Sequence, residues 1–346
     1  MNSPLENPLQ YTSKAIAILK DRSRVQDRSC PANLLSCKHM PLVTVTRPAP
    51  DELQAISTRR WDDLRTARPD LIPAVDLQEQ LLNIVVSATR AIEGKLPRLS
   101  LPPKYLAAKL SRGIPIFSGE PIPLPVQVLK ASFLQLCDAL AAGGAGEAAE
   151  HIKTSVAEGQ MEAGSLLTAS ISRNQEAIRT GAIHRGLAPD LVWLLAELAA
   201  SPFAHALQVA LLSSSADDTL AAAKREWSHG FCAMCGSWPA LAEFADGRRV
   251  LRCSFCAAAW ELNEYSCIYC GDNSETFVTA APNEERKDRR VEVCGACQGY
   301  LKTIDVPALS PFPLLAIYDM ETMDLDLAAM EHNYSRPPMK EFTARR

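Results

Sequence analysis

Eight of the eleven cysteines in this chain are arranged as four C-x-x-C pairs between positions 232 and 297. The pairs are Cys232/Cys235, Cys253/Cys256, Cys267/Cys270 and Cys294/Cys297. A turn with two residues between its cysteines directs both sulfurs at one ion, and two facing turns make a tetrahedral cage of four thiolates. Because the region has no cysteine outside these pairs, the sequence predicts two metal sites with these eight residues as ligands.

The intervals between the pairs favour two successive ribbons. Seventeen residues separate the first pair from the second, ten separate the second from the third, and twenty-three separate the third from the fourth. The two longer intervals suit a hairpin that places one cysteine turn opposite another. We therefore expect the first pair to share an ion with the second, and the third with the fourth. A cross-braced arrangement is the alternative.

The residues that follow the pairs are of two kinds. Gly236 and Gly271 come directly after the first and third pairs, where a tight turn can require a positive φ. Ala257 and Gln298 occupy the equivalent positions after the second and fourth pairs. We expect these two turns to be less regular.

Strand-like alternation surrounds the second pair. Residues 248–252 and 259–265 alternate between apolar and polar side chains on either side of it. Asp246-Gly247, just before the first of these segments, is typical of a hairpin turn. These features indicate β-ribbons around the cysteines.

Positions other than cysteine add a family signal. The segments that carry it are 232–239, 249–256, Trp260, 267–270 and 294–302. In this order they resemble the ribbon region of the FdhE family, the formate dehydrogenase accessory proteins. The resemblance includes non-cysteine residues that generic zinc ribbons do not share, namely Gly236, Ser237, Trp260 and the run Tyr300-Leu301-Lys302.

The resemblance implies both a cofactor and a role. In the family, the cysteines form two rubredoxin-like centres that bind iron, behind an α-helical N-terminal domain, and the protein assists maturation of formate dehydrogenase in the cytoplasm. The chemistry of thiolates by itself accepts iron or zinc, so zinc remains open. Residues 50–230 resemble the family in architecture only, and residues 1–47 are not covered.

The fold class predicted is multidomain α+β, with an N-terminal α-helical bundle followed by two small rubredoxin-like or zinc-ribbon β modules. Apolar residues recur at helical spacing in segments 50–68, 77–92, 126–142, 146–158, 166–180 and 188–212, the last with a break at Ser201-Pro202. The proline-rich stretch 96–124 is expected to be a surface connection with one short helix at 104–110. A further short helix is expected at 324–331.

Five parts of the chain follow from these patterns. They are a poorly ordered segment at 1–48, a helical domain at 49–228, a first ribbon at 229–262, a second ribbon at 263–306, and a C-terminal extension that packs back on the body at 307–346. Because the helical segment has its own apolar periodicity and no ligands, we expect it to keep its structure when metal is removed.

Cysteines and histidines outside the pairs receive no functional role. Cys30 and Cys37, with His39 nearby, have no matching half-site and are interpreted as unpaired thiols in a loose segment. Cys137 lies on an apolar helical face and is typical of a small buried hydrophobic residue. We interpret His184, His205 and Asp190 as ordinary helical residues. His229 is a linker residue or a hydrogen-bond donor to the first site. The aromatic residues Trp238, Trp260 and Tyr300 are expected to pack around the ribbons.

Composition argues against several classes of partner. The net charge is −4, and residues 230–302 hold eight Lys or Arg against ten Asp or Glu, so the ribbons offer no basic surface for nucleic acid. No apolar run reaches the roughly 18 residues needed to cross a bilayer, and we expect no membrane insertion. The charged N-terminus is unlike a signal peptide, and free thiols suit a reducing compartment. The sequence therefore predicts a cytoplasmic protein.

A four-thiolate site leaves no coordination position for a metal-bound water, which argues against hydrolytic chemistry. We therefore expect no enzyme but a maturation protein that binds the catalytic subunit of formate dehydrogenase through a metal-ribbon scaffold. The alternatives are a rubredoxin-like electron carrier and, less favoured by the acidic ribbons, a zinc-ribbon module for nucleic acid. The basic tail 334–346 is interpreted as a solvated end, with a contact arm for an acidic partner as the alternative.

Overall fold

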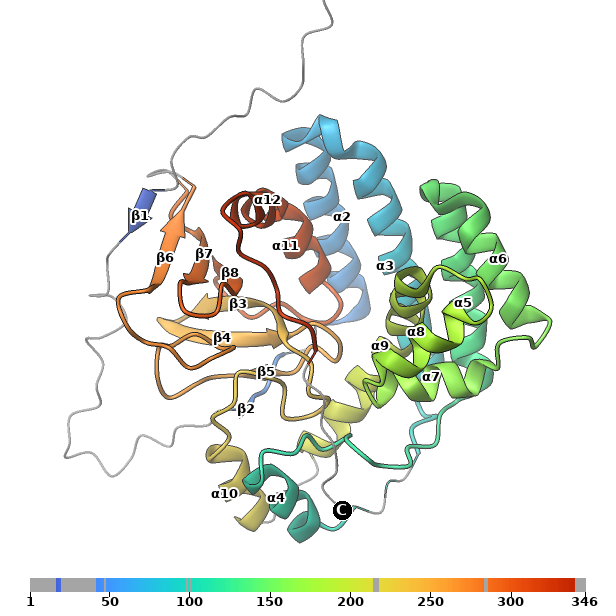
Figure 1. The fold of residues 1–346 in the computed structure, drawn as a ribbon, viewed down its shortest axis with the longest axis horizontal. Helices are drawn as coiled ribbons and strands as arrows, with labels where there is room; N and C mark the ends of the chain where they lie inside the picture. Colours follow the sequence, from blue (N-terminus) through green and yellow to red (C-terminus); the bar gives the residue numbers. More distant parts are fainter. Residues whose placement is uncertain are drawn as a thin grey trace, which may run out of the picture.

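A computed structural model of the chain describes residues 17–19, 42–46, 48–97, 99, 101–213, 218–282 and 286–339. Cys30, Cys37 and His39 lie outside the described residues, as does most of segment 1–48. The last seven residues of the basic tail, 340–346, lie outside them too. The described chain has a helical half and a sheet half, and the C-terminal helices lie between the two (Figure 1).

The N-terminal half is built from helices that pack side by side. They are α2 (Pro50–Ala67), α3 (Ile72–Ile92), α5 (Val126–Leu140), α6 (Gly146–Ala157), α7 (Ala163–Ile171), α8 (Gln175–Ile183) and α9 (Pro189–Ser213). Proline in the first turn starts α2 and α3, and Asp51 and Glu52 place negative charge at the N-terminus of α2. The central helix is α9, which contacts α3, α5, α7 and α8.

Helix α9 runs through Pro202 without the expected break. Proline has no amide hydrogen, so the carbonyl of Leu198, one turn earlier, loses its helical partner. The hydroxyl of Ser201 donates to this carbonyl at 3.2 Å and replaces the missing amide. The predicted break was therefore wrong because the residue before the proline satisfies the freed acceptor.

The single helix expected at 166–180 is divided into α7 and α8. Arg173 has a φ of 59°, in the left-handed region, which ends α7. The side chain of Asn174 then accepts a hydrogen bond from the amide of Ala177 at 3.0 Å and caps the start of α8. A further helix, α10 (Asp218–Arg225), was not expected, and it packs on α4 (Pro103–Ser111).

The proline-rich connection carries the expected short helix, α4, but it is not a surface connection throughout. Ile116 and Phe117 are each only 1% exposed. Their amides donate to the carbonyls of Ala233 and Met234 at 2.9 and 2.8 Å, inside the first C-x-x-C turn. The expectation failed because composition alone does not show what an apolar pair within a loop will cover.

The strands form a single sheet. They are β1 (Ala17–Leu19), β2 (Leu42–Val43), β3 (Pro239–Ala245), β4 (Arg248–Cys253), β5 (Ala259–Trp260), β6 (Phe277–Ala281), β7 (Arg289–Cys294) and β8 (Tyr300–Asp305). Their order is β1-β6-β7-β8-β3-β4-β5-β2. Asp246 and Gly247 both have positive φ at the β3–β4 turn, as a two-residue hairpin requires.

The two ribbons join edge to edge within this sheet. Strands β3, β4 and β5 make the first antiparallel ribbon, and β6, β7 and β8 make the second. Strand β3 pairs with β8 in parallel, from Leu241 opposite Lys302 to Phe244 opposite Asp305. Each ribbon thus covers an edge strand that the other would otherwise expose, so that the expected pair of β modules is one continuous sheet.

Charged residues are buried along this junction. Glu243 on β3 and Arg252 on β4 form an ion pair with no exposed side-chain surface. Glu243 also accepts from the amide of Ser310, and Arg252 donates to the carbonyl of the same residue at 2.7 Å. Lys302 on β8 is likewise buried and donates to Asp326 at 2.6 Å. Each of these buried charges therefore has a partner of opposite charge, as burial requires.

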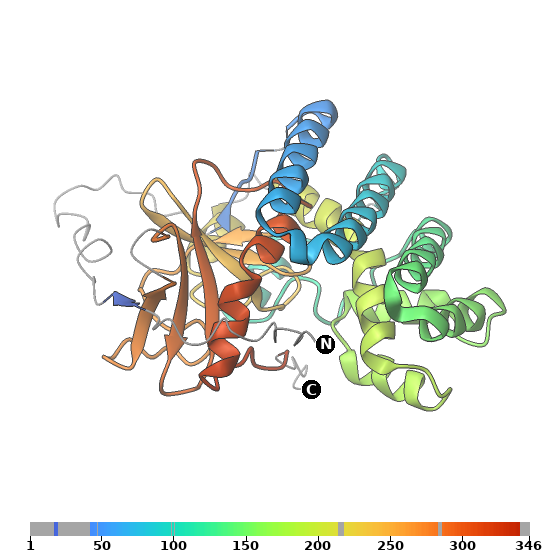
Figure 2. The ribbon, with the colours of Figure 1, turned by 90° about the horizontal axis from the view of Figure 1, so that it is seen from above.

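The C-terminal extension returns between the halves. Helices α11 (Leu315–Glu321) and α12 (Met323–Glu331) lie between the orange strands and the blue and green helices in both views (Figures 1 and 2). Contacts connect α11 with α2 and α3, and α12 with β7 and β8. Trp61 and Leu82 of the helical half form one apolar cluster with Ile317.

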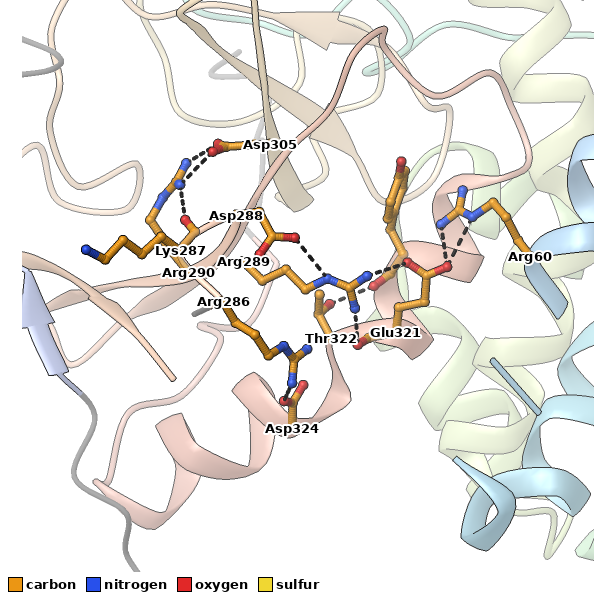
Figure 3. Close-up of polar contacts among 11 residues, drawn as sticks. Arg60, Arg286, Lys287, Asp288, Arg289, Arg290, Asp305, Glu321, Thr322 and Asp324 are labelled. Atoms are coloured by element: carbon orange, nitrogen blue, oxygen red, sulfur yellow. Dashed lines mark hydrogen bonds and ion pairs between the residues drawn. The ribbon is translucent and has the colours of Figure 1, made fainter. Parts of the chain in front are cut away.

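Glu321 joins three elements. Its carboxylate accepts from Arg60 of α2 at 2.9 and 3.1 Å and pairs with Arg289 of β7 at 3.4 Å (Figure 3). Nearby, Arg286 donates to Asp324 of α12 at 3.0 Å, and Arg290 pairs with Asp305 of β8 (Figure 3). The side chains of Arg286, Arg289 and Arg290, at and just before the start of β7, therefore make ion pairs within the protein.

The largest apolar core crosses from helices to ribbon. It includes Leu129 and Phe203 of the helical half together with Met234, Phe255 and Trp260 of the first ribbon. Of the described helices, α9 alone is long and apolar enough to cross a membrane by length and composition, and half of that stretch is buried inside the protein. A core helix has this same composition.

Candidate metal centres

The eight paired cysteines form two clusters. In the first, Cys232, Cys235, Cys253 and Cys256 have their four Sγ atoms within 4.8 Å of one another. The closest contacts join Cys232 to Cys256 at 3.6 Å and Cys235 to Cys253 at 3.4 Å. The first pair thus faces the second, and the cross-braced alternative does not occur.

The second cluster repeats this arrangement. Cys267, Cys270, Cys294 and Cys297 also have their Sγ atoms within 4.8 Å of one another. Cys267 lies 3.6 Å from Cys297, and Cys270 lies 3.6 Å from Cys294, measured between sulfurs. Within each cluster the first cysteine of one pair faces the last cysteine of the other.

The sulfur spacing fits a tetrahedral metal ion. A metal–sulfur bond of about 2.3 Å places the corners of a tetrahedron roughly 3.8 Å apart. The closest sulfur–sulfur distances in the two clusters, 3.4 to 3.6 Å, are slightly shorter than this. Small shifts of the cysteine side chains would therefore accommodate an ion. The two clusters could each hold one metal ion, and four soft thiolates accept zinc or iron.

All four cysteine turns have the same backbone geometry. The residue after each pair is in the left-handed region, with φ of 85° at Gly236, 55° at Ala257, 81° at Gly271 and 56° at Gln298. The first cysteine amide of every pair donates to the carbonyl five residues later, at 2.8 to 2.9 Å. The expectation of two less regular turns was wrong, because the alanine and glutamine accept the strained conformation that the turn imposes.

Backbone amides are directed at the sulfurs. The amide of Met234 lies 3.4 Å from Sγ of Cys232, and the amides of Phe255 and Cys256 lie 3.4 Å from Sγ of Cys253. Amide donors at this distance stabilise the thiolate over the thiol. The turns therefore prepare the sulfurs for an ion before any metal binds.

The pKa values of the thiols show why a cation is needed. Burial raises the pKa values of Cys232 and Cys256 well above the ordinary thiol value. Burial opposes ionisation of Cys235 too, but hydrogen bonds from the other three thiols outweigh it and lower its pKa. Burial thus opposes ionisation of the thiols in the first cluster, and a positive ion at its centre would offset that cost.

The second cluster follows the same pattern with weaker burial. Burial raises the pKa of Cys267, and it raises the pKa of Cys297 to about 11. Burial opposes ionisation of Cys270, but the backbone amide of Asp272 and the neighbouring thiols lower its pKa. Each cluster thus has one thiol with a lowered pKa, Cys235 in the first and Cys270 in the second.

A loop and a helix cover the first cluster. The loop amides of Ile116 and Phe117 bind its first turn, and the buried ammonium of Lys109 holds the loop by donating to the carbonyls of Ile116 and Ser118 at 2.8 and 2.6 Å. From α9, Nδ1 of His205 lies 3.1 Å from the carbonyl of Cys256. The sequence analysis did not single out Lys109, and it interpreted His205 as an ordinary helical residue, because a single residue on a helix gives no signal of its partner.

The other residues considered from sequence have packing contacts. Nε1 of Trp260 donates to the carbonyl of His229 at 3.1 Å, and Nε1 of Trp238 donates to the carbonyl of Pro338 at 2.9 Å. His229 stacks on the ring of Phe231. Cys137 is fully buried, and burial raises its pKa to about 12. His184 follows the end of α8 and Asp190 lies in the first turn of α9, and neither lies among the cysteines.

Comparisons with known proteins point to one family, although the chain matches no protein-family model. It is 29% identical to "Protein FdhE homolog" of Aquifex aeolicus over 116 residues, which are 31% of this chain and 40% of that protein. It is 28% identical to the homologue of Haemophilus influenzae strain PittGG over 115 residues, 32% of this chain and 37% of that protein. These alignments therefore span less than half of either relative.

A longer match comes from a third relative and from a solved structure. The chain is 25% identical to "Protein FdhE homolog" of Rhizobium meliloti over 236 residues, 64% of this chain and 76% of that protein. The crystal structure of the FdhE protein from Pseudomonas aeruginosa aligns with 86% of this chain and 98% of its own, with a TM-score of 0.52 and 21% identity, and so has the same fold. In these relatives, in this fold and in its two four-cysteine clusters, the chain is similar to FdhE proteins.

Proposed function

We propose that the chain is an accessory protein for the maturation of formate dehydrogenase and that it acts in the cytoplasm by binding the catalytic subunit of that enzyme. Similarity to FdhE proteins in sequence and in fold is the observation that carries the proposal. The chemistry of the clusters supports it, because four protein thiolates around one ion leave no position for a substrate or an activated water. The chain therefore acts on another protein and is not itself an enzyme.

The metal centres support binding by holding the sheet in shape. We propose that each cluster holds one ion, iron by family resemblance, with zinc as the alternative that thiolates also accept. An ion at the first cluster connects the turns at the ends of β3 and β4, and an ion at the second connects those next to β6 and β7. The ions thereby stabilise the surface that meets the catalytic subunit.

Deletion of the gene tests the proposal. Extracts of the deletion strain should lose formate-dependent dye reduction while the catalytic subunit is still synthesised, and the intact gene should restore activity. The double variant Cys267→Ser/Cys270→Ser should fail to restore it and should capture less catalytic subunit under anaerobic conditions. Ala296→Ser, an exposed substitution inside the turn of the fourth pair, is the matched control and should behave as the wild type.

Two results would remove the partner assignment. One is normal formate oxidation in the deletion strain. The other is failure of the purified, metal-loaded chain to capture any formate dehydrogenase subunit. Either result would leave the two metal centres unaffected.

One observation favours a second candidate function, a rubredoxin-like electron carrier. Cys270 and Cys297 are exposed, which brings the second centre close enough to solvent for an electron donor to approach. If the chain carries electrons, the visible absorption of the iron-loaded protein should bleach with a reductase and return on reoxidation. An iron protein that keeps its spectrum under turnover would exclude this function.

A further inference from the structure

The two clusters differ in exposure. Each of the four cysteines of the first is at most 3% exposed. In the second, Cys267 and Cys294 are buried, whereas Cys270 and Cys297 are exposed, and the residues between Cys294 and Cys297 are exposed too. The turns have the same backbone geometry, so the difference comes from what packs over them.

The cover of the first cluster comes from distant parts of the chain. The loop at Ile116 and Phe117 lies over one turn, and His205 of α9 contacts another. Phe255, inside the second pair, is 2% exposed and belongs to the core that also contains helical residues. Among the described residues, no such loop or helix lies over Cys270 and Cys297, both of which remain exposed.

The charge beside the two clusters also differs. At the first, the guanidinium of Arg173 lies 4.3 Å from the centroid of the Phe255 ring and 4.7 Å from that of Trp193, and its side chain is 6% exposed. Glu197 binds one guanidinium nitrogen, while Nε and Nη1 have no hydrogen-bond partner within the described chain. A buried cation is therefore placed where it opposes the negative charge of a four-thiolate metal centre.

At the second cluster a carboxylate lies beside the sulfurs. Oδ2 of Asp272 lies 3.7 Å from Sγ of Cys294. The hydroxyl of Thr276 donates to the same oxygen at 2.8 Å and holds the carboxylate in this position. A carboxylate beside the sulfurs does not offset the negative charge of a four-thiolate metal centre, whereas a cation does.

We propose that the two centres have separate tasks: the first holds its ion permanently as part of the core, and the second is where the chain exchanges metal with thiol or chelator ligands from outside. Exchange requires an incoming ligand to reach the ion or a proton to reach a thiolate, and only the second centre is open to either. The inference rests on the proposed binding of two ions. It is independent of the formate dehydrogenase partner.

Zinc release from the full chain tests the division. The zinc-loaded protein is mixed with excess 4-(2-pyridylazo)resorcinol, and released zinc is followed by absorbance. One ion per chain should leave at least tenfold faster than the other. Release of both ions in one phase, or in two phases closer than tenfold, would overturn the division. A starting content other than about two ions would instead contradict the proposed metal sites.

Alkylation identifies which centre is fast. Brief treatment of the zinc protein with iodoacetamide, followed by peptide mass spectrometry, should label Cys270 and Cys297 at least tenfold faster than Cys232 and Cys235. The order of labelling in protein that starts with about two zinc ions decides which centre is open. Labelling of the first-cluster thiols at an equal or higher rate would overturn it.

The loop provides a variant that opens the first centre. Lys109→Ala removes the buried ammonium that holds residues 116 and 118, and should accelerate the slow phase at least threefold while the fast phase is unchanged. Lys104→Ala, an exposed lysine on the same helix, is the matched control and should change neither phase. An unaltered slow phase in Lys109→Ala would show that this loop is not the cover.

Discussion

At the scale of single residues, the cysteine turns show how position overrides intrinsic preference. Gly236 and Gly271 take positive φ without a Cβ to oppose it. Ala257 and Gln298 take nearly the same backbone conformation although it costs an L-residue roughly 1 to 2 kcal/mol. The hydrogen bonds of the turn and the sulfur positions offset that cost, which is why sequence reasoning expected irregularity where none exists.

Gln298 allows this strain to be measured. Its exposed side chain donates to the carbonyl of Gly295 at 2.8 Å, and both Gln298→Gly and Gln298→Ala remove this hydrogen bond. Only glycine relieves the strained φ, so Gln298→Gly should be more stable than Gln298→Ala by about 1 kcal/mol. Urea unfolding of the metal-loaded variants measures the difference. Equal stability would mean that the turn relaxes around alanine.

At the scale of elements, α9 continues through Pro202 because the hydroxyl of Ser201 replaces the hydrogen bond that the proline cannot make. The bond from Ser201 to the carbonyl of Leu198 is internal to the helix, and both residues lie where α9 meets the rest of the helical half. A sequence pattern contains Ser201-Pro202 but does not say whether the serine donates backwards or faces solvent. That choice depends on the side-chain rotamer, which packing around the helix selects.

Replacement of this serine should therefore weaken the helix. Ser201→Ala leaves the carbonyl of Leu198 without a donor in a partly buried position and should lower the free energy of unfolding by about 1 to 2 kcal/mol. Ser170→Ala is the matched control, because the buried hydroxyl of Ser170 has no hydrogen-bond partner in the described chain and its loss should be neutral or stabilising. If the two variants lose equal stability, the hydroxyl of Ser201 is not what continues the helix.

At the scale of the whole molecule, the continuous core connects metal to helix. The expectation from sequence is a helical domain that keeps its structure without metal. The apolar cluster that contains Leu129 and Phe203 also contains the cysteines of the first centre, and Glu321 connects α2 with β7. Loss of the first ion should therefore lower the stability of helices that contain no metal ligand.

Removal of metal provides the corresponding test. Long chelation that empties both sites should lower the midpoint of the helical circular dichroism melt by on the order of 10 °C, because metal binding is folding free energy. Brief chelation that empties only the exposed second site should lower it less, and re-addition of zinc should restore it. Identical midpoints with and without metal would support an independent helical domain instead.

The sequence by itself determined the parts of this protein that depend on short-range spacing. The two-residue gaps define the cysteine turns, the intervals between pairs indicate which turns face each other, and apolar periodicity places most helices near their observed bounds. Metal occupancy itself stays a prediction.

Only the tertiary structure decided what these parts contact. The parallel pairing of β3 with β8, the loop of Ile116 over the first centre and the approach of Arg173 to Phe255 each join residues more than 50 positions apart. Such contacts produce no periodic pattern in the sequence, because they form only when all the elements between the two residues have packed together. The difference between a covered and an open metal centre lies entirely in those contacts, since the four cysteine turns have the same backbone geometry.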